Sequence, residues 1–76
     1  MWKEKHKTLT RTFKFKNFSQ AFSFMTEVAI EAEKLNHHPN WSNEYNVVII
    51  NLSTHDAANI ITNKDRELAQ AIDGLL

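Results

Sequence analysis

The chain is divided by the stretch Glu33-Lys34-Leu35-Asn36-His37-His38-Pro39-Asn40-Trp41, where a helical pattern of apolar residues ends and an extended pattern begins. The stretch contains two of the four histidines and the only proline. Proline disfavours helical backbone in the residue before it, so we expect His38 to lie outside the helix that carries Glu33. If helical geometry persists to His37, Glu33 lies one turn before it and the two side chains can touch.

Two imidazoles that leave a helix end in different directions, with a carboxylate nearby, suit proton transfer near neutral pH. Glu33 lies at the border of the apolar arc of the helix, so we expect its carboxylate to be half-sheltered from solvent. A plainer interpretation stays open, because an imidazolium at a helix C-terminus also complements the helix dipole.

A zinc site is a further alternative, since His37, His38, His55 and Glu33 are all ligand types that zinc accepts. Adjacent histidines, however, lack the i, i+4 helical spacing that points two imidazoles at one ion, and the chain has no cysteine. We therefore expect no metal.

Length and composition predict one small domain spanning residues 1–76, whose limited core makes a shared subunit interface a reasonable expectation. Nine basic and nine acidic side chains cancel, which argues against a nucleic-acid or anionic-membrane partner. No apolar run approaches the roughly 20 residues of a membrane span, and no signal peptide is visible. We expect a cytoplasmic protein.

The N-terminal part predicts two strands, Trp2–Lys5 and Leu9–Lys16, followed by a helix. Asn17 is a suitable N-cap for this helix, with Gln20 placed to return the hydrogen bond. The apolar arc of the helix is wide for a helix that covers one small sheet, so we expect Phe24 or Ile30 to contact another subunit. The arc consists of Phe18, Ala21, Phe22, Phe24, Met25, Val28, Ala29, Ala32 and Leu35.

The C-terminal part predicts a second hairpin, Trp41–Tyr45 with Val47–Ser53, and a last helix over Asn63–Asp73. Thr62 and Asp65 have the spacing of a capping box for that helix. The order strand-strand-helix-strand-strand-helix indicates an α+β fold, a four-stranded antiparallel sheet with helices packed on one face. Val48, Ile50 and Leu52 are expected to face the core, with Val47 and Ile49 on the opposite face.

Several spaced elements of the chain resemble the signature of the pterin-4a-carbinolamine dehydratases. They are Glu33-x3-His37-His38-Pro39, Tyr45, Ser53-Thr54-His55 and Asp65. The flanking sequence at residues 11–18 and 21–35 also resembles that family. The resemblance runs from about Trp2 to the C-terminus. It implies a four-stranded antiparallel sheet packed by helices, assembly into homodimers or homotetramers, and a pterin bound beside the histidines without metal or other cofactor.

The resemblance also implies an activity, the dehydration of 4a-hydroxytetrahydropterin to quinonoid dihydropterin and water. Such a hydro-lyase recycles a tetrahydrobiopterin-type cofactor after an aromatic amino acid hydroxylase has used it. We expect His38 and His55 to form the proton-transfer pair, with His37 positioning the substrate or sharing the acid role. The remaining expected site residues are Glu33, which would orient His37, then Asn36, Ser53 and Thr54, which would line the pterin site, and Asp65, a helix cap with a supporting role.

One departure from the family pattern is Asn36, where relatives often have aspartate before the histidine pair. Two alternatives to this enzyme stay open. The family includes an animal member that serves as a dimerisation cofactor of a homeodomain transcription factor, so an interaction protein is one. A paralogue that handles another pterin is the other.

Overall fold

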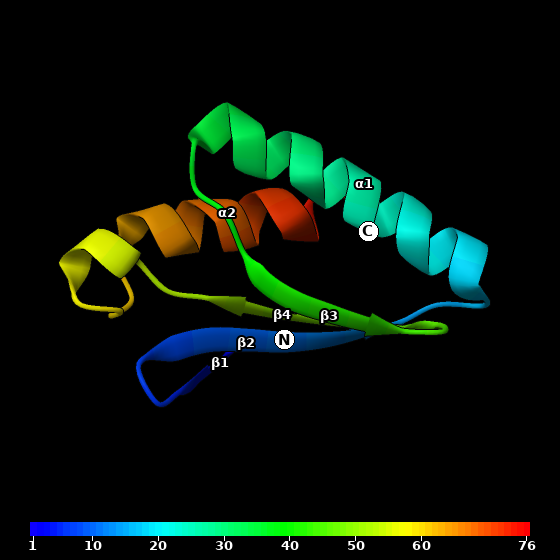
Figure 1. Ribbon diagram of the computed structural model, residues 1–76, viewed down its shortest axis with the longest axis horizontal. Coiled ribbons are helices and arrows are strands. Elements are labelled where there is room, and N and C mark those ends of the chain that lie inside the picture. The colour runs from blue at the N-terminus through cyan, green and yellow to red at the C-terminus, as the bar shows by residue number, and fades with distance from the viewer.

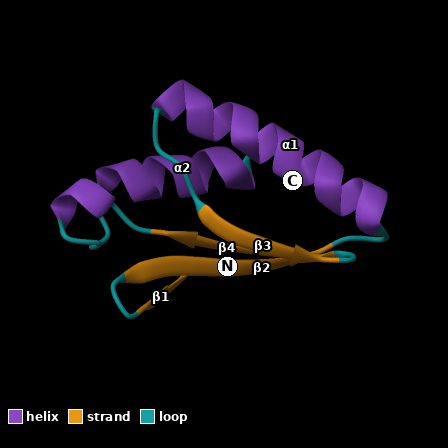
Figure 2. Ribbon diagram, in the orientation of Figure 1, coloured by secondary structure: helices purple, strands orange, loops and turns teal.

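Two β-hairpins and two helices build the fold in the computed structural model, which describes residues 1–76 (Figure 1). The strands pair antiparallel in the order β1-β2-β4-β3, and both helices cover the same face of the sheet (Figure 2). The predicted fold class is confirmed. The elements are β1 (Lys3–Lys5), β2 (Thr8–Lys14), α1 (Phe18–Leu35), β3 (Asn40–Glu44), β4 (Val47–Leu52), a 3-10 turn η1 (His55–Ala57) and α2 (Asn63–Asp73).

The hairpin turns lack the Asn-Gly or Asp-Gly pairs that usually mark such turns, so the ends of the strands could not be predicted accurately. His6 and Lys7 both adopt positive φ, 52° and 63°, as a two-residue turn between twisted strands requires. At the other end, Phe15 leaves the ladder and exchanges hydrogen bonds with Asn46, whose backbone oxygen and side-chain amide both lie 2.9 Å from it. β2 therefore ends at Lys14, two residues before the predicted limit.

The core lies between the sheet and the two helices. Val48, Ile50 and Leu52 face inward from β4 and are fully buried, as predicted. The aromatic rings of Phe13, Phe15 and Phe24 pack together, with centroid separations of 4.8 Å and 4.9 Å from Phe24 to the other two. The other buried apolar residues are Leu9, Ala21, Val28, Ala32, Leu68, Ala69 and Ile72.

Arg11 is the one charged residue on the inward side of β2. Its guanidinium lies 4.7 Å from the centroid of the Phe13 ring and pairs with Asp73 at 2.7 Å. The same Asp73 oxygen accepts a hydrogen bond from the indole of Trp2 at 2.8 Å. These contacts satisfy the charge at the edge of the core and connect the first hairpin to the end of α2.

The buried stripe of α1 is narrower than its apolar arc. Only the residues at positions 21, 24, 28 and 32 are buried, because one sheet and one neighbouring helix cover a single stripe. Phe18 and Phe22 remain 49% and 54% exposed, contrary to their place in the predicted arc. Phe24 is buried within the chain, so the expectation that it contacts another subunit is wrong. Ile30 is 52% exposed.

The start of α1 is capped much as predicted. The Asn17 side chain accepts the backbone N–H of Gln20 at 2.9 Å, but the Gln20 side chain accepts from Lys16 rather than from Asn17. The return half of the predicted capping box is therefore wrong, because Gln20 reaches one residue further back. Neither helix has the length and hydropathy of a membrane span.

Two phenylalanines on α1 provide a direct test of this packing. Phe24→Ala should lower the free energy of unfolding by about 3–5 kcal/mol, because it opens a cavity beside Phe13 and Phe15. Phe22→Ala, at a site 54% exposed, should cost under about 0.5–1 kcal/mol. Urea unfolding followed by circular dichroism measures both. Equal losses in the two variants would contradict the assignment of Phe24 alone to the core.

Candidate active site

The chain leaves α1 through a left-handed residue that sets the direction of both histidines. Asn36 has φ 50° and ψ 44°, a conformation that asparagine tolerates better than most residues. The N–H of Asn36 donates to the carbonyl of Glu33 at 3.1 Å, and the N–H of His37 donates to that of Ala32 at 3.0 Å. This is a Schellman motif, and it takes His37 off the surface of the helix.

His37 then packs inward onto Asp65, a carboxylate that is fully buried. The imidazole Nε2 of His37 lies 2.5 Å from Asp65 Oδ1. The other carboxylate oxygen accepts the Thr54 hydroxyl at 2.7 Å and the Thr62 backbone N–H at 2.9 Å. One carboxylate thus joins the exit of α1, the end of β4 and the start of α2.

The surroundings of Asp65 keep it ionised. Burial by itself raises the pKa of this carboxyl, but the hydrogen bonds from His37, the Thr62 N–H and Thr54, with the charge of His37, together hold the pKa below its ordinary value. Because an ionised carboxylate only accepts, Nε2 of His37 carries a proton. The Nδ1 atom is then the only ring nitrogen of His37 left for a ligand.

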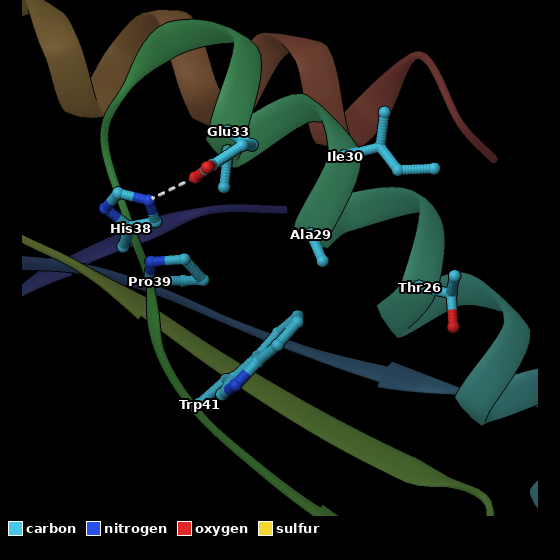
Figure 3. Close-up of a pocket in the computed structure, with 8 residues that line it drawn as sticks. Thr26, Ala29, Ile30, Glu33, His38, Pro39 and Trp41 are labelled. Carbon is cyan, nitrogen blue, oxygen red and sulfur yellow. Dashed lines mark hydrogen bonds and ion pairs between the residues drawn. The ribbon is translucent and has the colours of Figure 1, made fainter.

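Glu33 contacts the second histidine rather than the first. Its carboxylate lies 2.8 Å from Nε2 of His38 (Figure 3). The prediction that Glu33 orients His37 is wrong, because the left-handed Asn36 turns His37 toward α2 and brings His38 back beside the helix. The Glu33 side chain is 79% exposed, so the expectation of a half-sheltered carboxylate is also wrong.

A polar hollow of about 210 Å³ opens between the end of α1 and the residues after β4. All six residues expected to contact the substrate line it, and it has no apolar lining residue. The hollow brings His55 to the same cavity as the histidine pair, although the sequence separates them. The six lining residues that the sequence predicted are Asn36, His37, His38, Ser53, Thr54 and His55.

His55 begins the 3-10 turn and is held by one weak contact. Its Nδ1 lies 3.3 Å from the side-chain oxygen of Asn59, which only accepts, so Nδ1 carries the proton and Nε2 is unprotonated in the neutral ring. The backbone N–H of Thr54 donates to the carbonyl of Ile60 at 2.8 Å and is not available to a ligand. Of the Ser53-Thr54 pair, Ser53 is therefore the better source of backbone hydrogen bonds.

Two charged lining residues, Asp56 and Lys64, were not expected from the sequence. Asp56 follows His55 directly, and Lys64 lies in the first turn of α2 beside the Asp65 cap. The predicted capping box at Thr62 already placed the first turn of α2, so it contained the signal for Lys64. No group of three or more histidine, aspartate or glutamate side chains is arranged to hold a metal ion.

The arrangement can be compared with known proteins. Residues 1–75 match the family described as pterin 4 alpha carbinolamine dehydratase. The chain belongs to this pterin-4a-carbinolamine dehydratase family. A protein from Prochlorococcus marinus strain NATL2A that is provisionally named pterin-4-alpha-carbinolamine dehydratase is 53% identical over 75 residues. The match covers 99% of this chain and 78% of that protein. A protein from Rhodospirillum rubrum with the same provisional name is 56% identical over 68 residues. That match covers 90% of this chain and 70% of the Rhodospirillum rubrum protein.

Solved structures of similar proteins have the same fold as this dehydratase-family chain. A transcriptional coactivator/pterin dehydratase from Brucella melitensis superposes with a TM-score of 0.89 at 44% identity, covering 96% of this chain and 79% of that one. A pterin dehydratase-like protein, described as a RuBisCO assembly factor in the alpha-carboxysome, gives a TM-score of 0.82 at 26% identity, covering 97% and 87%. The family resemblance seen in the sequence is confirmed.

Asp65→Asn should weaken the fold, and it should do so in a pH-dependent way. An asparagine keeps the shape but loses the charge that His37 and two other donors face, at a cost of about 2–3 kcal/mol at pH 7. The pKa of Asp65 is depressed by folding, so its contribution is complete above the unfolded value of about 3.9 and is lost as the pH falls through the folded value.

Denaturant unfolding of both proteins between pH 7 and pH 2 measures this effect. The difference in unfolding free energy between wild type and Asp65→Asn should be largest at neutral pH and should shrink on acidification. Asp56→Asn, at an exposed position, is the matched control and should leave the curve nearly unchanged. A difference independent of pH would contradict the charged network.

Proposed function

We propose that the chain dehydrates a 4a-hydroxytetrahydropterin to the quinonoid dihydropterin and water. The observation that carries this proposal is the meeting of three imidazoles, His37, His38 and His55, at one polar hollow. Membership of the dehydratase family supports the same reaction. Because the chemistry needs only one proton donor and one proton acceptor, histidines suffice for it near pH 7.

The reaction breaks the bond between C4a and its hydroxyl oxygen and removes the proton of ring nitrogen N5. The hydroxyl leaves as water after accepting a proton, and the electrons of the N5–H bond form the C4a–N5 double bond. We assign the two proton transfers to His38 and His55. His38 reaches the hollow from the segment after α1, and His55 reaches it from the 3-10 turn η1. Glu33, 2.8 Å from Nε2 of His38, would hold that ring so that Nδ1 faces the substrate.

His37 has a different role in this proposal. His37 is 9% exposed and its ring is held by Asp65, so the ring suits positioning the pterin through Nδ1 better than transferring protons. The edge of a pterin carries both donors and acceptors. The amide of Asn36, the ammonium of Lys64 and the carboxylate of Asp56 would supply complementary partners in the same hollow.

The wider setting follows from the substrate. A 4a-carbinolamine arises when an aromatic amino acid hydroxylase uses its pterin cofactor, so we propose a functional link to such an enzyme. From the composition and the family resemblance, we also propose that the protein is cytoplasmic and homo-oligomeric. We propose that no metal or additional cofactor takes part, because the pterin itself is the substrate.

His38→Ala and His55→Ala should each lower kcat by about 10²–10⁴, since each removes a positioned proton-transfer group. The assay generates the carbinolamine with a hydroxylase and follows the quinonoid product by its absorbance. The matched control is His6→Asn, which changes an exposed histidine in the β1–β2 turn while tolerating its positive φ of 52°.

A variant at Glu33 tests the role of the residue that contacts His38. Glu33→Gln should reduce kcat less than His38→Ala, because it weakens the contact that orients the His38 ring but leaves the ring in place. If His38→Ala and His55→Ala retain the wild-type rate, or if wild type gives no acceleration over buffer, the proposal fails.

A second function, as an interaction protein, has one observation in its favour. Phe18 and Phe22 stack on the outer side of α1 at a centroid separation of 5.7 Å while both remain about half exposed. The Brucella melitensis relative described as a transcriptional coactivator and the relative described as an assembly factor make such a role worth testing. Cross-linking that captures only copies of this chain would count against it.

A further inference from the structure

A second cavity adjoins the polar hollow and differs from it in character. It is a groove of about 550 Å³ between α1 and the entry to β3 (Figure 3). Ala29 and Ile30 of α1 form one side, while Pro39 and Trp41 form the other. The hydrogen-bonded pair of Glu33 and His38 lies at one end, and the rest of the lining is mostly apolar.

The two cavities share one residue, because His38 lines both the hollow and the groove. Asn36, His37 and His55 line only the hollow. The groove and the hollow lie against the same imidazole, so a substituent that reaches around the His38 ring from the hollow would enter the groove. The position of His38 makes the groove an extension of the candidate active site.

We infer that this apolar groove receives the substituent on C6 of the pterin and favours aromatic or aliphatic substituents over polyhydroxylated ones. The inference rests on the proposed function. In a tetrahydropterin, C6 is bonded directly to N5, the nitrogen that loses its proton in the dehydration. With N5 facing His38, the C6 substituent lies beside that ring and points to the cavity on its other side.

The groove walls determine which substituent fits. Trp41 is half-buried and offers a ring face, and Ile30 is 52% exposed and gains burial when the groove is filled. Apart from the Glu33–His38 pair, the only polar groups on the lining side chains are the Thr26 hydroxyl and the Trp41 indole N–H. Hydroxyl groups placed against Ala29, Ile30 and Pro39 lose water partners without replacement, which penalises a polyhydroxylated chain.

The test compares three stable 7,8-dihydropterins that differ only at C6, carrying hydrogen, phenyl or trihydroxypropyl. Titration calorimetry on the wild-type protein should show the phenyl compound binding about tenfold or more tighter than the trihydroxypropyl compound. Ala29→Leu, which fills the groove from an exposed position on α1, should abolish that preference without changing the affinity for the unsubstituted compound.

Ser23→Leu is the matched control, since it adds a leucine to an exposed position of the same helix outside the groove. Its preference between the compounds should equal that of wild type. A preference that survives in Ala29→Leu, or is absent in wild type, overturns the inference. So does a change in assembly mass by light scattering in Ala29→Leu with ligand preference intact, which would make the groove an interface between copies.

The same compounds separate this inference from the proposed function. If wild-type protein dehydrates the carbinolamine but shows no preference at C6, only the groove assignment fails. If the unsubstituted dihydropterin does not bind and no dehydration is seen, the proposed function fails first, and the groove assignment fails with it.

Discussion

The fold of the site depends on a single buried carboxylate. Asp65 accepts hydrogen bonds from His37, Thr54 and the backbone of Thr62, so three segments distant in sequence meet at one side chain. Partners offset the desolvation cost of a buried carboxylate, whereas removal of one partner leaves that cost uncompensated. The cap of α2 and the position of His37 are therefore one structural unit, and neither can change without the other.

The histidines that meet at the hollow are supported unequally. His37 is nearly enclosed and bound to an enclosed carboxylate, while His38 pairs with Glu33 at the surface, where both side chains are well exposed. His55 has only a long contact to Asn59. A rigid ring suits holding a substrate in place, and loosely held rings suit exchanging protons with water between turnovers. The three rings thus differ in how firmly neighbouring side chains hold them, and the difference agrees with the proposed roles of His37 in positioning and of His38 and His55 in proton transfer.

Much of the architecture was readable from residue patterns. The alternation in β4 and the capping pair Thr62 and Asp65 predicted the inward face and the limits of α2, because both signals are local. The partner of Glu33 was not readable, since it depends on the left-handed Asn36, which reverses the side chains that follow. Neither was the burial of Phe24 with exposure of Phe22, because the sequence shows the width of an apolar arc but not how much of it a neighbouring layer covers. Asp56 enters the hollow only through tertiary folding, whereas the predicted capping box had already placed Lys64 in the first turn of α2.

Asn36 has a consequence for how the hollow responds to its solvent. Because this residue is an amide, the charged side chains that line the hollow, apart from the histidines, are one carboxylate, Asp56, and one ammonium, Lys64. These balance, so no net field draws an anion or a cation inward. Recognition of the proposed pterin, an uncharged heterocycle, would then rest on the directions of short-range hydrogen bonds. Its affinity should vary little with ionic strength, since counterions screen net fields far more than such contacts.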